Sequence, residues 1–427
     1  MKRMTFLTIV GLMVLAGTMV HAELPLPDLT VAADGSGDFK TVQAAVESLA
    51  RTNTERKIIF LKDGVYHEKV RVDASCVTLR GQSRKGTRIE FAQLNDDFTK
   101  SPDSLGRAVL NLSEGANDFV LENLTVANTA GVVGPHAFAV FGKADRTAIV
   151  DCEVLSDGAD TVSLWSGERG RYYHANCNFR GAVDFVCPRG WCYVTNCHFF
   201  EVKNTAATWH DGSKNQDQKF VLRGCQFDGT NGWVLARHHL DAQLYYLDCQ
   251  FSATLADRAP RRVVYPLGGG EPSEADKKKN AENDAHNLWG ERNYFWNCHR
   301  VGGDFAWFTN QLPEKISASD VTAAWTFAGK WNPENTNGPT IQKISRAGEK
   351  LSVTFSEPMT VKGQPQLKLA EQGTADYASG SGSATLVFKT TARGKVLALE
   401  ANGGWVVASE ASAALRIADL RLPPDLN

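Results

Sequence analysis

Short segments rich in β-branched and aromatic residues alternate with Gly, Asn and Asp from Asp28 to about Trp331, and six of them carry a Cys directly after an Asp, Asn or Gly. The six cysteines are Cys152, Cys177, Cys197, Cys225, Cys249 and Cys298. Successive members lie 25, 20, 28 and 24 residues apart and the last step is 49, which equals two turns if one turn lacks the marker. Repeats of this length indicate stacked supersecondary units, and the composition favours short strands over helix pairs. The pattern therefore predicts an all-β fold whose main part is a parallel β-helix.

The composition of the chain changes after residue 331. Residues 332–338 are rich in turn formers and predict a linker. Beyond them, alternating apolar and polar segments separated by Gly and Ser predict a small β-sandwich over residues 339–427. The stretches 354–358 (TFSEP) and 380–386 (GSGSATL) look like the Ig-like modules appended to bacterial surface and secreted enzymes. The predicted solenoid then occupies residues 28–331.

Charge and the N-terminal segment limit the possible partners. The formal net charge is −2, with 46 Lys and Arg against 48 Asp and Glu, so no basic field for nucleic acid is expected. Residues 1–22 combine Lys2 and Arg3, an apolar run and a small-residue end at Ala22, which predicts a cleaved signal peptide. No Cys follows Ala22 to carry a lipid anchor, and no later apolar run is long enough to span a bilayer. We expect a monomer that is secreted or periplasmic.

The nine cysteines are an odd number, and six of them occupy one place in the repeat. Equivalent places stack in a solenoid, so these six are expected to be small buried apolar residues in an internal ladder. A metal site from Cys187, Cys192 and Cys197 is disfavoured because their spacing lacks the tight pairs of zinc sites. No metal or cofactor is expected. A disulfide between two of Cys76, Cys187 and Cys192 remains open.

Asp160 and Asp184 lie 24 residues apart, close to one repeat, and follow their cysteines by eight and seven residues. Stacked coils lie roughly 4.8 Å apart, so the two carboxylates are expected side by side. Their repulsion is expected to raise one pKa while the other stays low, as an acid and a nucleophile at one site require. The alternative is that both are turn residues beside Gly.

A polar insertion runs from Gly268 to Asn280, between two turns of the predicted solenoid. We expect a solvated loop there that lines the rim of a groove.

A series of segments, in matching order and spacing, resembles pectin methylesterases over roughly residues 28–309. The segments are 31–46 (VAADGSGDFKTVQAAV), 64–68 (GVYHE), 123–131 (NLTVANTAG), 158–161 (GADT), 183–186 (VDFV) and 235–239 (LARHH). The resemblance implies a right-handed parallel β-helix of the pectin-lyase-like type and an esterase that works without a metal. By position, it implies that Asp184 is the nucleophile, Asp160 the general acid and base, and Arg237 the partner that holds Asp184 ionised.

The sequence departs from that family at several site positions. His136 and Ala159 stand where pectin methylesterases carry two Gln that donate to the oxyanion, so His136 is the remaining side-chain candidate for this role. His238 and His239 replace a Pro-Trp pair. The candidates for contact with sugar are His238, His239, Trp165, Trp209, Trp233 and Trp307.

The expected function is therefore hydrolysis of methyl esters on a pectin-like uronic acid polymer. One alternative is a glycoside hydrolase, because paired carboxylates also serve that reaction, although Arg237 would then have no evident role. The other is a catalytically inactive polysaccharide-binding solenoid, which the missing Gln residues favour.

Overall fold

The computed structural model describes residues 27–267, 269–334, 341–400, 405–408 and 420–421. The expected signal peptide at residues 1–22 and most of the expected linker at residues 332–338 lie outside the described residues. Among the described residues, none of the helices has the length and apolar character needed to cross a bilayer.

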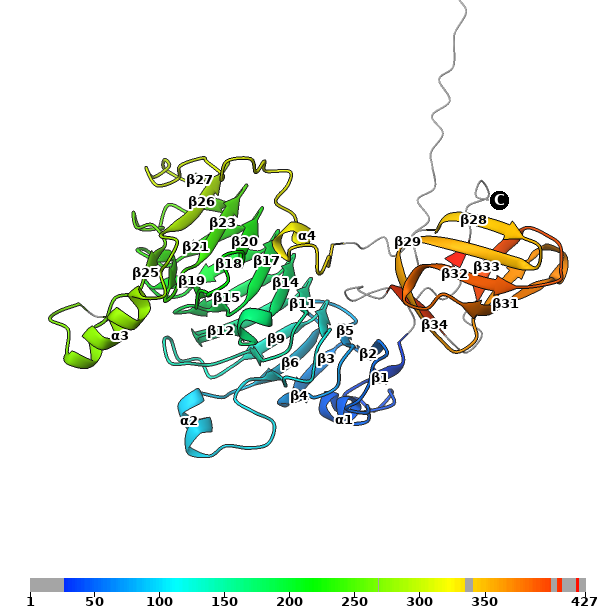
Figure 1. Cartoon of the computed structure of the whole chain (residues 1–427). Helices are drawn as coiled ribbons and strands as arrows, with labels where there is room; N and C mark the ends of the chain where they lie inside the picture. The colour runs from blue at the N-terminus through cyan, green and yellow to red at the C-terminus, as the bar shows by residue number, and fades with distance from the viewer. Residues whose placement is uncertain (1–26, 268, 335–340, 401–404, 409–419, 422–427) are drawn as a thin grey trace, which may run out of the picture.

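Three parallel sheets, here called A, B and C, run along the N-terminal part of the chain (Figure 1). Sheet A contains β1 (Leu29–Val31), β2 (Lys57–Leu61), β5 (Val77–Gly81), β8 (Val120–Glu122), β11 (Thr147–Val150), β14 (Arg171–Ala175), β17 (Trp191–Thr195), β20 (Phe220–Arg223), β23 (Gln243–Leu247) and β26 (Arg292–Trp296). Sheet B contains β3 (Gly64–His67), β6 (Thr87–Phe91), β9 (Thr125–Asn128), β12 (Glu153–Ala159), β15 (Asn178–Ala182), β18 (His198–Glu201), β21 (Gln226–Gly229), β24 (Gln250–Phe251) and β27 (His299–Arg300). Sheet C contains β4 (Val70–Val72), β7 (Leu110–Leu112), β10 (Val140–Gly142), β13 (Val162–Leu164), β16 (Val186–Pro188), β19 (Ala206–His210), β22 (Val234–His238) and β25 (Arg261–Arg262). From β2 to β25 each coil contributes one strand to A, then B, then C, which confirms the expected parallel β-helix.

The repeated Asp, Asn or Gly before Cys marks the corner between sheets A and B. The residue before each of the six cysteines has a positive φ. These residues are Asp151, Asn176, Asn196, Gly224, Asp248 and Asn297. Asp, Asn and Gly are the residues that tolerate this left-handed conformation best. The corner turns the following Cys inward, and all six are buried, as expected. None of the nine cysteines, all of which are described, forms a disulfide, and Cys76 lies at a different corner, directly before β5.

The 49-residue step between Cys249 and Cys298 is one coil and not two. Strand β24 pairs directly with β27, and β23 pairs directly with β26. The extra length is an insertion after β25. Because the insertion is about as long as one repeat, the spacing of the cysteines alone resembles that of two coils.

The insertion contains helix α3 (Glu274–Asp284), so the expectation of a loop was wrong there. Ser273 forms a capping box with Asp276, and the following Lys, Ala and Glu residues favour a helix. None of its side chains is buried. Asn280 fastens the helix by bonding both backbone groups of Tyr265, and Asp284 pairs with Arg262.

The other helices are short. They are α1 (Val42–Glu47), α2 (Asn95–Lys100), α4 (Ala323–Thr326) and the 3₁₀ turns η1 (Gly167–Arg169) and η2 (Ala370–Gln372). Inside the solenoid, Phe179, Phe199, Phe227 and Phe251 form a ladder with successive ring centroids 5.4, 4.4 and 5.2 Å apart. Stacked apolar rows of this kind hold the coils in register.

The C-terminal part is antiparallel, as expected for a small β-sandwich (Figure 1). Its strands are β28 (Ile341–Ala347), β29 (Lys350–Lys362), β30 (Gln366–Leu369), β31 (Thr374–Ser379), β32 (Ser383–Lys389), β33 (Val396–Glu400), β34 (Trp405–Ala408) and β35 (Leu420–Arg421). They enclose their own apolar cluster, which includes Val353, Phe355 and Leu386. This part therefore has a core separate from that of the solenoid.

Candidate active site

Asp160 and Asp184 occupy the same corner, between sheets B and C, on neighbouring coils. Val162 pairs with Val186, and each aspartate lies two residues before its Val. Both have a positive φ, 57° at Asp160 and 59° at Asp184. The backbone N–H of Asp160 donates to the carbonyl oxygen of Val183 at 3.2 Å, so the two corners stack directly. The two interpretations of the aspartates are therefore compatible. Asp160 and Asp184 are turn residues, and they also lie side by side at one corner of the solenoid.

Arg237 reaches Asp184 from β22, two strands along sheet C. Its Nε lies 2.9 and 3.1 Å from the two carboxylate oxygens of Asp184, and its Nη2 lies 2.7 Å from Oδ2. The side chains are only 21% and 10% exposed. A planar guanidinium that bonds both oxygens fixes the orientation of the carboxylate as well as its charge.

Burial raises the pKa of both aspartates to about 6. At Asp184 the hydrogen bonds and positive charge of Arg237 oppose this effect, while the charge of Asp160 adds to it. The expectation was a split between one raised and one low pKa, and the structure raises both. The partners still distinguish them. Arg237 bonds the carboxylate of Asp184 directly, whereas the side-chain hydrogen bond to Asp160 comes from a neutral hydroxyl, that of Ser163, and the charges of Arg189 and Arg237 also lower the pKa of Asp160. When only one of the two carboxyl groups is protonated, these contacts favour the proton on Asp160.

Ser163 and Arg189 were missed in the sequence. Ser163 Oγ donates to Asp160 at 3.1 Å and accepts from Trp165 Nε1 at 2.6 Å. The guanidinium of Arg189 lies 3.7 Å from the Trp165 ring centroid, bonds Asp211 at 3.0 Å and lowers the pKa of Asp160. Trp165 and Arg189 each lie five residues after an aspartate of the pair. The one-coil spacing that relates the aspartates could have identified this second stacked pair.

His136 lies beside Asp160. It forms a parallel bridge with Ala159, and its Nε2 lies 3.9 Å from Asp160 Oδ1. The ring stacks on Phe138 with centroids 5.8 Å apart, and its side chain is 54% exposed. Burial of the remainder lowers the pKa of His136, so the imidazole is neutral near pH 7 and has one N–H to donate.

A buried carboxyl group supports the backbone at Asp184. Glu201 is fully buried, and its Oε1 accepts from Lys203 N at 2.9 Å and from Thr205 Oγ1 at 3.2 Å. Thr205 Oγ1 in turn accepts from the N–H of Val183 at 3.1 Å. Val183 has a φ of 42°, which is rare for a β-branched residue. The Glu201 and Thr205 contacts therefore hold a strained corner next to Asp184.

Three of the proposed sugar-contact residues lie near the aspartates. Trp165 contacts Ser163, and Trp209 lies beside Arg237, whose guanidinium carbon is 5.5 Å from the ring centroid. His239 packs edge-on against Trp209 at 4.3 Å and bonds the hydroxyl of Tyr265. Burial lowers the pKa of His239 to about 4, so it carries no positive charge for a carboxylate near pH 7.

The other three lie elsewhere. Trp233 is fully buried in the solenoid core and has no surface to offer a sugar. His238 is 2% exposed, and its ring bonds the carbonyl of Leu240 and the carboxylate of Glu291. Trp307 packs on Phe295 of β26, far along the coils from β13 and β16. These three do not join the group around the aspartates.

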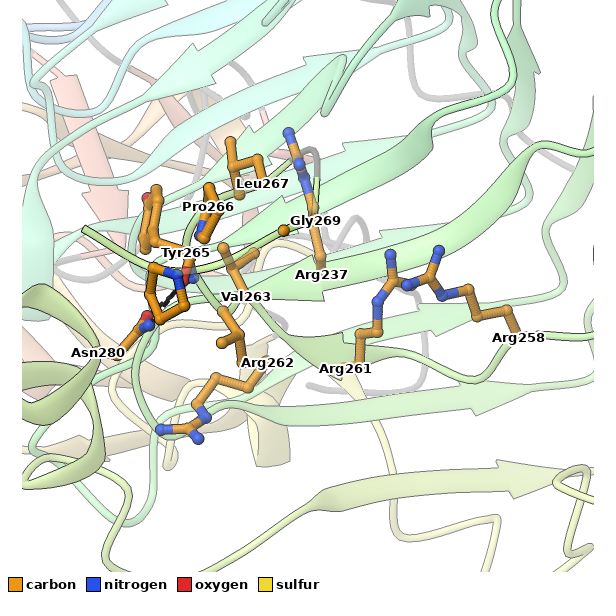
Figure 2. A pocket seen from close by; sticks show the side chains of 13 residues that line it. Arg237, Arg258, Arg261, Arg262, Val263, Tyr265, Pro266, Leu267, Gly269 and Asn280 are labelled. Carbon is orange, nitrogen blue, oxygen red and sulfur yellow. Dashed lines mark hydrogen bonds between the residues drawn. The ribbon is translucent and has the colours of Figure 1, made fainter. Parts of the chain in front are cut away.

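A pocket of about 620 Å³ adjoins Arg237 (Figure 2). It is formed mainly by β25 and the segment that follows it. The lining residues are Arg237, Arg258, Arg261, Arg262, Val263, Val264, Tyr265, Pro266, Leu267, Gly269, Gly270, Pro272 and Asn280. The pocket combines positive charge with apolar walls.

Comparisons relate this chain to known proteins. The family model Pectinesterase matches residues 28–254. A pectinesterase of Petunia integrifolia is 34% identical over 174 residues, which are 40% of this chain and 44% of that protein. Pectinesterase 1 of Citrus sinensis is 35% identical over 213 residues, which are 48% of this chain and 35% of that protein. The chain thus spans less than half of the length of either relative.

Solved structures match over a larger part of the chain. A pectin methylesterase in complex with hexasaccharide VII superposes with a TM-score of 0.55 at 18% identity, over 72% of this chain and 99% of that one. The pectin methylesterase from carrot gives 0.53 at 20% identity, over 72% and 95%. These likenesses establish a common fold. Because the family model covers more than half of the chain, including the coils with Asp160, Asp184 and Arg237, this chain belongs to the pectinesterase family.

Proposed function

We propose that this chain is an exported carboxylic ester hydrolase that removes methyl groups from esterified uronic acid polymers such as pectin. The solenoid, residues 28–331, carries the chemistry, and residues 339–427 form an appended Ig-like module. The observation that carries the proposal is the buried Asp184, oriented by the Nε and Nη2 groups of Arg237, beside Asp160, whose pKa is raised to about 6. Family membership supports it.

In the first half of the reaction, a carboxylate oxygen of Asp184 attacks the ester carbonyl carbon. The C–O bond to the methoxy group breaks, and Asp160 gives its proton to the departing oxygen, so methanol leaves. An anhydride then joins Asp184 to the sugar carboxyl group. Arg237 orients the attacking oxygen, and burial removes water from the carboxylate before attack.

In the second half, Asp160 is ionised and takes a proton from water. The resulting hydroxide adds to the sugar carbonyl of the anhydride, and the bond to Asp184 breaks. This step regenerates the Asp184 carboxylate and protonated Asp160, and the polymer gains one free carboxylic acid. One proton thus passes between Asp160, methanol and water, as the raised pKa requires.

Negative charge develops on the carbonyl oxygen in both halves. His136, whose Nε2 lies 3.9 Å from Asp160, is the side chain that donates to it. Ala159 has no side-chain donor, and its backbone N–H already bonds the carbonyl of Pro135 at 2.9 Å. His136 therefore takes the main role in stabilising the oxyanion.

The glycosidase alternative has less support because Arg237 bonds Asp184 through two nitrogens. That contact suits a nucleophile held ionised, and not the water-activating base of an inverting glycosidase; release of methanol distinguishes the esterase from a retaining glycosidase. An experiment distinguishes the inactive binding solenoid from the esterase. Incubation with methylated polygalacturonate should release methanol. Release of reducing ends without methanol would favour a glycosidase, and release of neither would favour a binding module.

A further inference from the structure

The pocket beside Arg237 contains more positive charge than its surroundings neutralise. Of its four arginines, Arg237 pairs with Asp184 and Arg262 pairs with Asp284. Arg258 and Arg261 have no acidic partner among the described residues. Figure 2 shows Arg262 directed away from these two arginines, while Arg258 and Arg261 extend toward the same region.

Arg261 also has an unused buried donor. Its Nη1 is buried and has no hydrogen-bond partner among the described residues. Arg261 is the register partner of Arg237 across β22 and β25, and burial together with the positive charges of Arg258 and Arg237 lowers the pKa of Arg261. Arginines gathered without a counter-ion are unfavourable unless an anion joins them.

A planar carboxylate is the anion that this arrangement fits best. Guanidinium groups bond both oxygens of a carboxylate, and the low polarity of Val263, Pro266 and Leu267 strengthens such bonds. The pocket is also placed to receive a second residue of a long substrate. Strand β25 lies three strands beyond β16 in sheet C, or about 14 Å at the usual strand spacing.

We propose that Arg258 and Arg261 bind a free carboxylate of an unesterified uronic acid residue in the same polymer chain whose methyl ester meets Asp184. The inference deepens the proposed function and rests on it. Both arginines lie beyond residue 254, where the match to the family model ends, whereas Arg237 lies within it. The enzyme accordingly favours partly de-esterified polymer over fully methylated polymer, and its product competes with its substrate.

The test compares the parent with Arg258→Gln, Arg261→Gln and the double variant. Arg51→Gln is the matched control, because Arg51 is an 83% exposed arginine on the N-terminal side of the solenoid, paired with Asp73. Binding of a fully de-esterified oligogalacturonate is measured by calorimetry at two salt concentrations, with acetate as a separate ligand. The ratio of kcat/KM on partly de-esterified pectin to kcat/KM on fully methylated pectin is measured in parallel.

The parent should bind the oligogalacturonate, more weakly at higher salt. Each single variant should lose about tenfold or more in affinity, as expected for a lost bond to a charged group, and the kcat/KM ratio should fall by a similar factor. Arg51→Gln should match the parent in both. Acetate binding as tightly as the oligomer, and lost with the same arginines, would show a site for small carboxylates and overturn the polymer assignment.

Arg258→Glu is a second variant that keeps the test decisive if Arg261→Gln fails to fold. Arg258 is exposed, so its reversal does not disturb the core, and the change should abolish oligomer binding. Unchanged oligomer affinity in Arg258→Glu, with methanol release intact, would refute the pocket and leave the esterase standing. An arginine-dependent affinity in a parent that releases no methanol from any ester would retain the carboxylate site and refute the esterase.

Discussion

Replacing Glu201 with Gln should make the protein more stable at neutral and alkaline pH. Glu201 is fully buried, and burial raises its pKa from 4.5 to about 8. The folded protein therefore holds a neutral carboxylic acid near pH 7, whereas the unfolded chain holds an anion. Gln keeps the carbonyl oxygen that accepts from Lys203 and Thr205, and it cannot ionise.

The sign and size follow from proton linkage. Below pH 4.5 Glu201 is protonated in both states and its stabilising contribution is fully present. Between pH 4.5 and 8 the folded state binds more protons than the unfolded state, so the free energy of unfolding falls as pH rises. From pH 5.5 to 7.5 the loss is about 2.5 kcal/mol, at roughly 1.4 kcal/mol per pH unit. Glu201→Gln removes this loss.

Urea unfolding followed by tryptophan fluorescence at pH 5.5, 6.5 and 7.5 provides the measurement. The stability of Glu201→Gln relative to the parent should rise by about 2.5 kcal/mol across this range. Glu282→Gln, on exposed helix α3, is the control and should follow the parent at every pH. Parallel curves for the parent and Glu201→Gln, within about 0.5 kcal/mol, would refute the claim that Glu201 is folded as a neutral acid.

Four further outcomes are expected. Asp184→Asn and Asp160→Asn should each reduce methanol release below a tenth of the parent without unfolding the solenoid, because its stability is spread over many coils; higher activity in either would exclude that residue from its role. His136→Ala should lower kcat by about 10²-fold with little change in KM, and an unchanged kcat would mean that the oxyanion is stabilised elsewhere. Arg189→Met removes a charge that lowers the pKa of Asp160, so the alkaline limb of the kcat/KM profile should move to higher pH, and a fixed limb would contradict the assignment of that limb to Asp160. Reducing agent should leave the melting temperature unchanged because the nine cysteines form no disulfide, whereas a fall beyond about 10 °C would require one.

The main fold could be predicted because its corners constrain the sequence. A left-handed residue before an inward Cys leaves few amino acids at each position, so the marker at Asn176 and Cys177 recurs from coil to coil. The spacing between cysteines did not give the number of coils between Cys249 and Cys298. The 49-residue step reads equally as two coils or as one coil with an insertion, and only the pairing of β24 with β27 decides between them.

The site was predictable where residues stack at a fixed coil offset, as Asp160 and Asp184 do. The remaining site residues could not be predicted, because the sequence does not show which way each side chain points. Arg237 faces outward on β22, so the alternation of a strand turns its neighbour His238 inward and removes it from the substrate side. Glu201 could not be identified, because an acidic residue in a strand pattern reads as exposed until the neighbouring coils are placed over it.

The corner at Val183 has a consequence for how this protein can change over evolutionary time. Asp, Asn or Gly takes the left-handed position at all six Cys-marked corners, yet here a Val with a φ of 42° precedes Asp184. A strained backbone of this kind costs on the order of 1–3 kcal/mol. Asn or Gly at position 183 would relieve this strain, and Gly would also widen the range of conformations open to the corner beside Asp184. In lineages that are no longer selected for ester hydrolysis, Val183 should therefore be replaced early. The residues at the Cys-marked corners serve folding alone and should be kept.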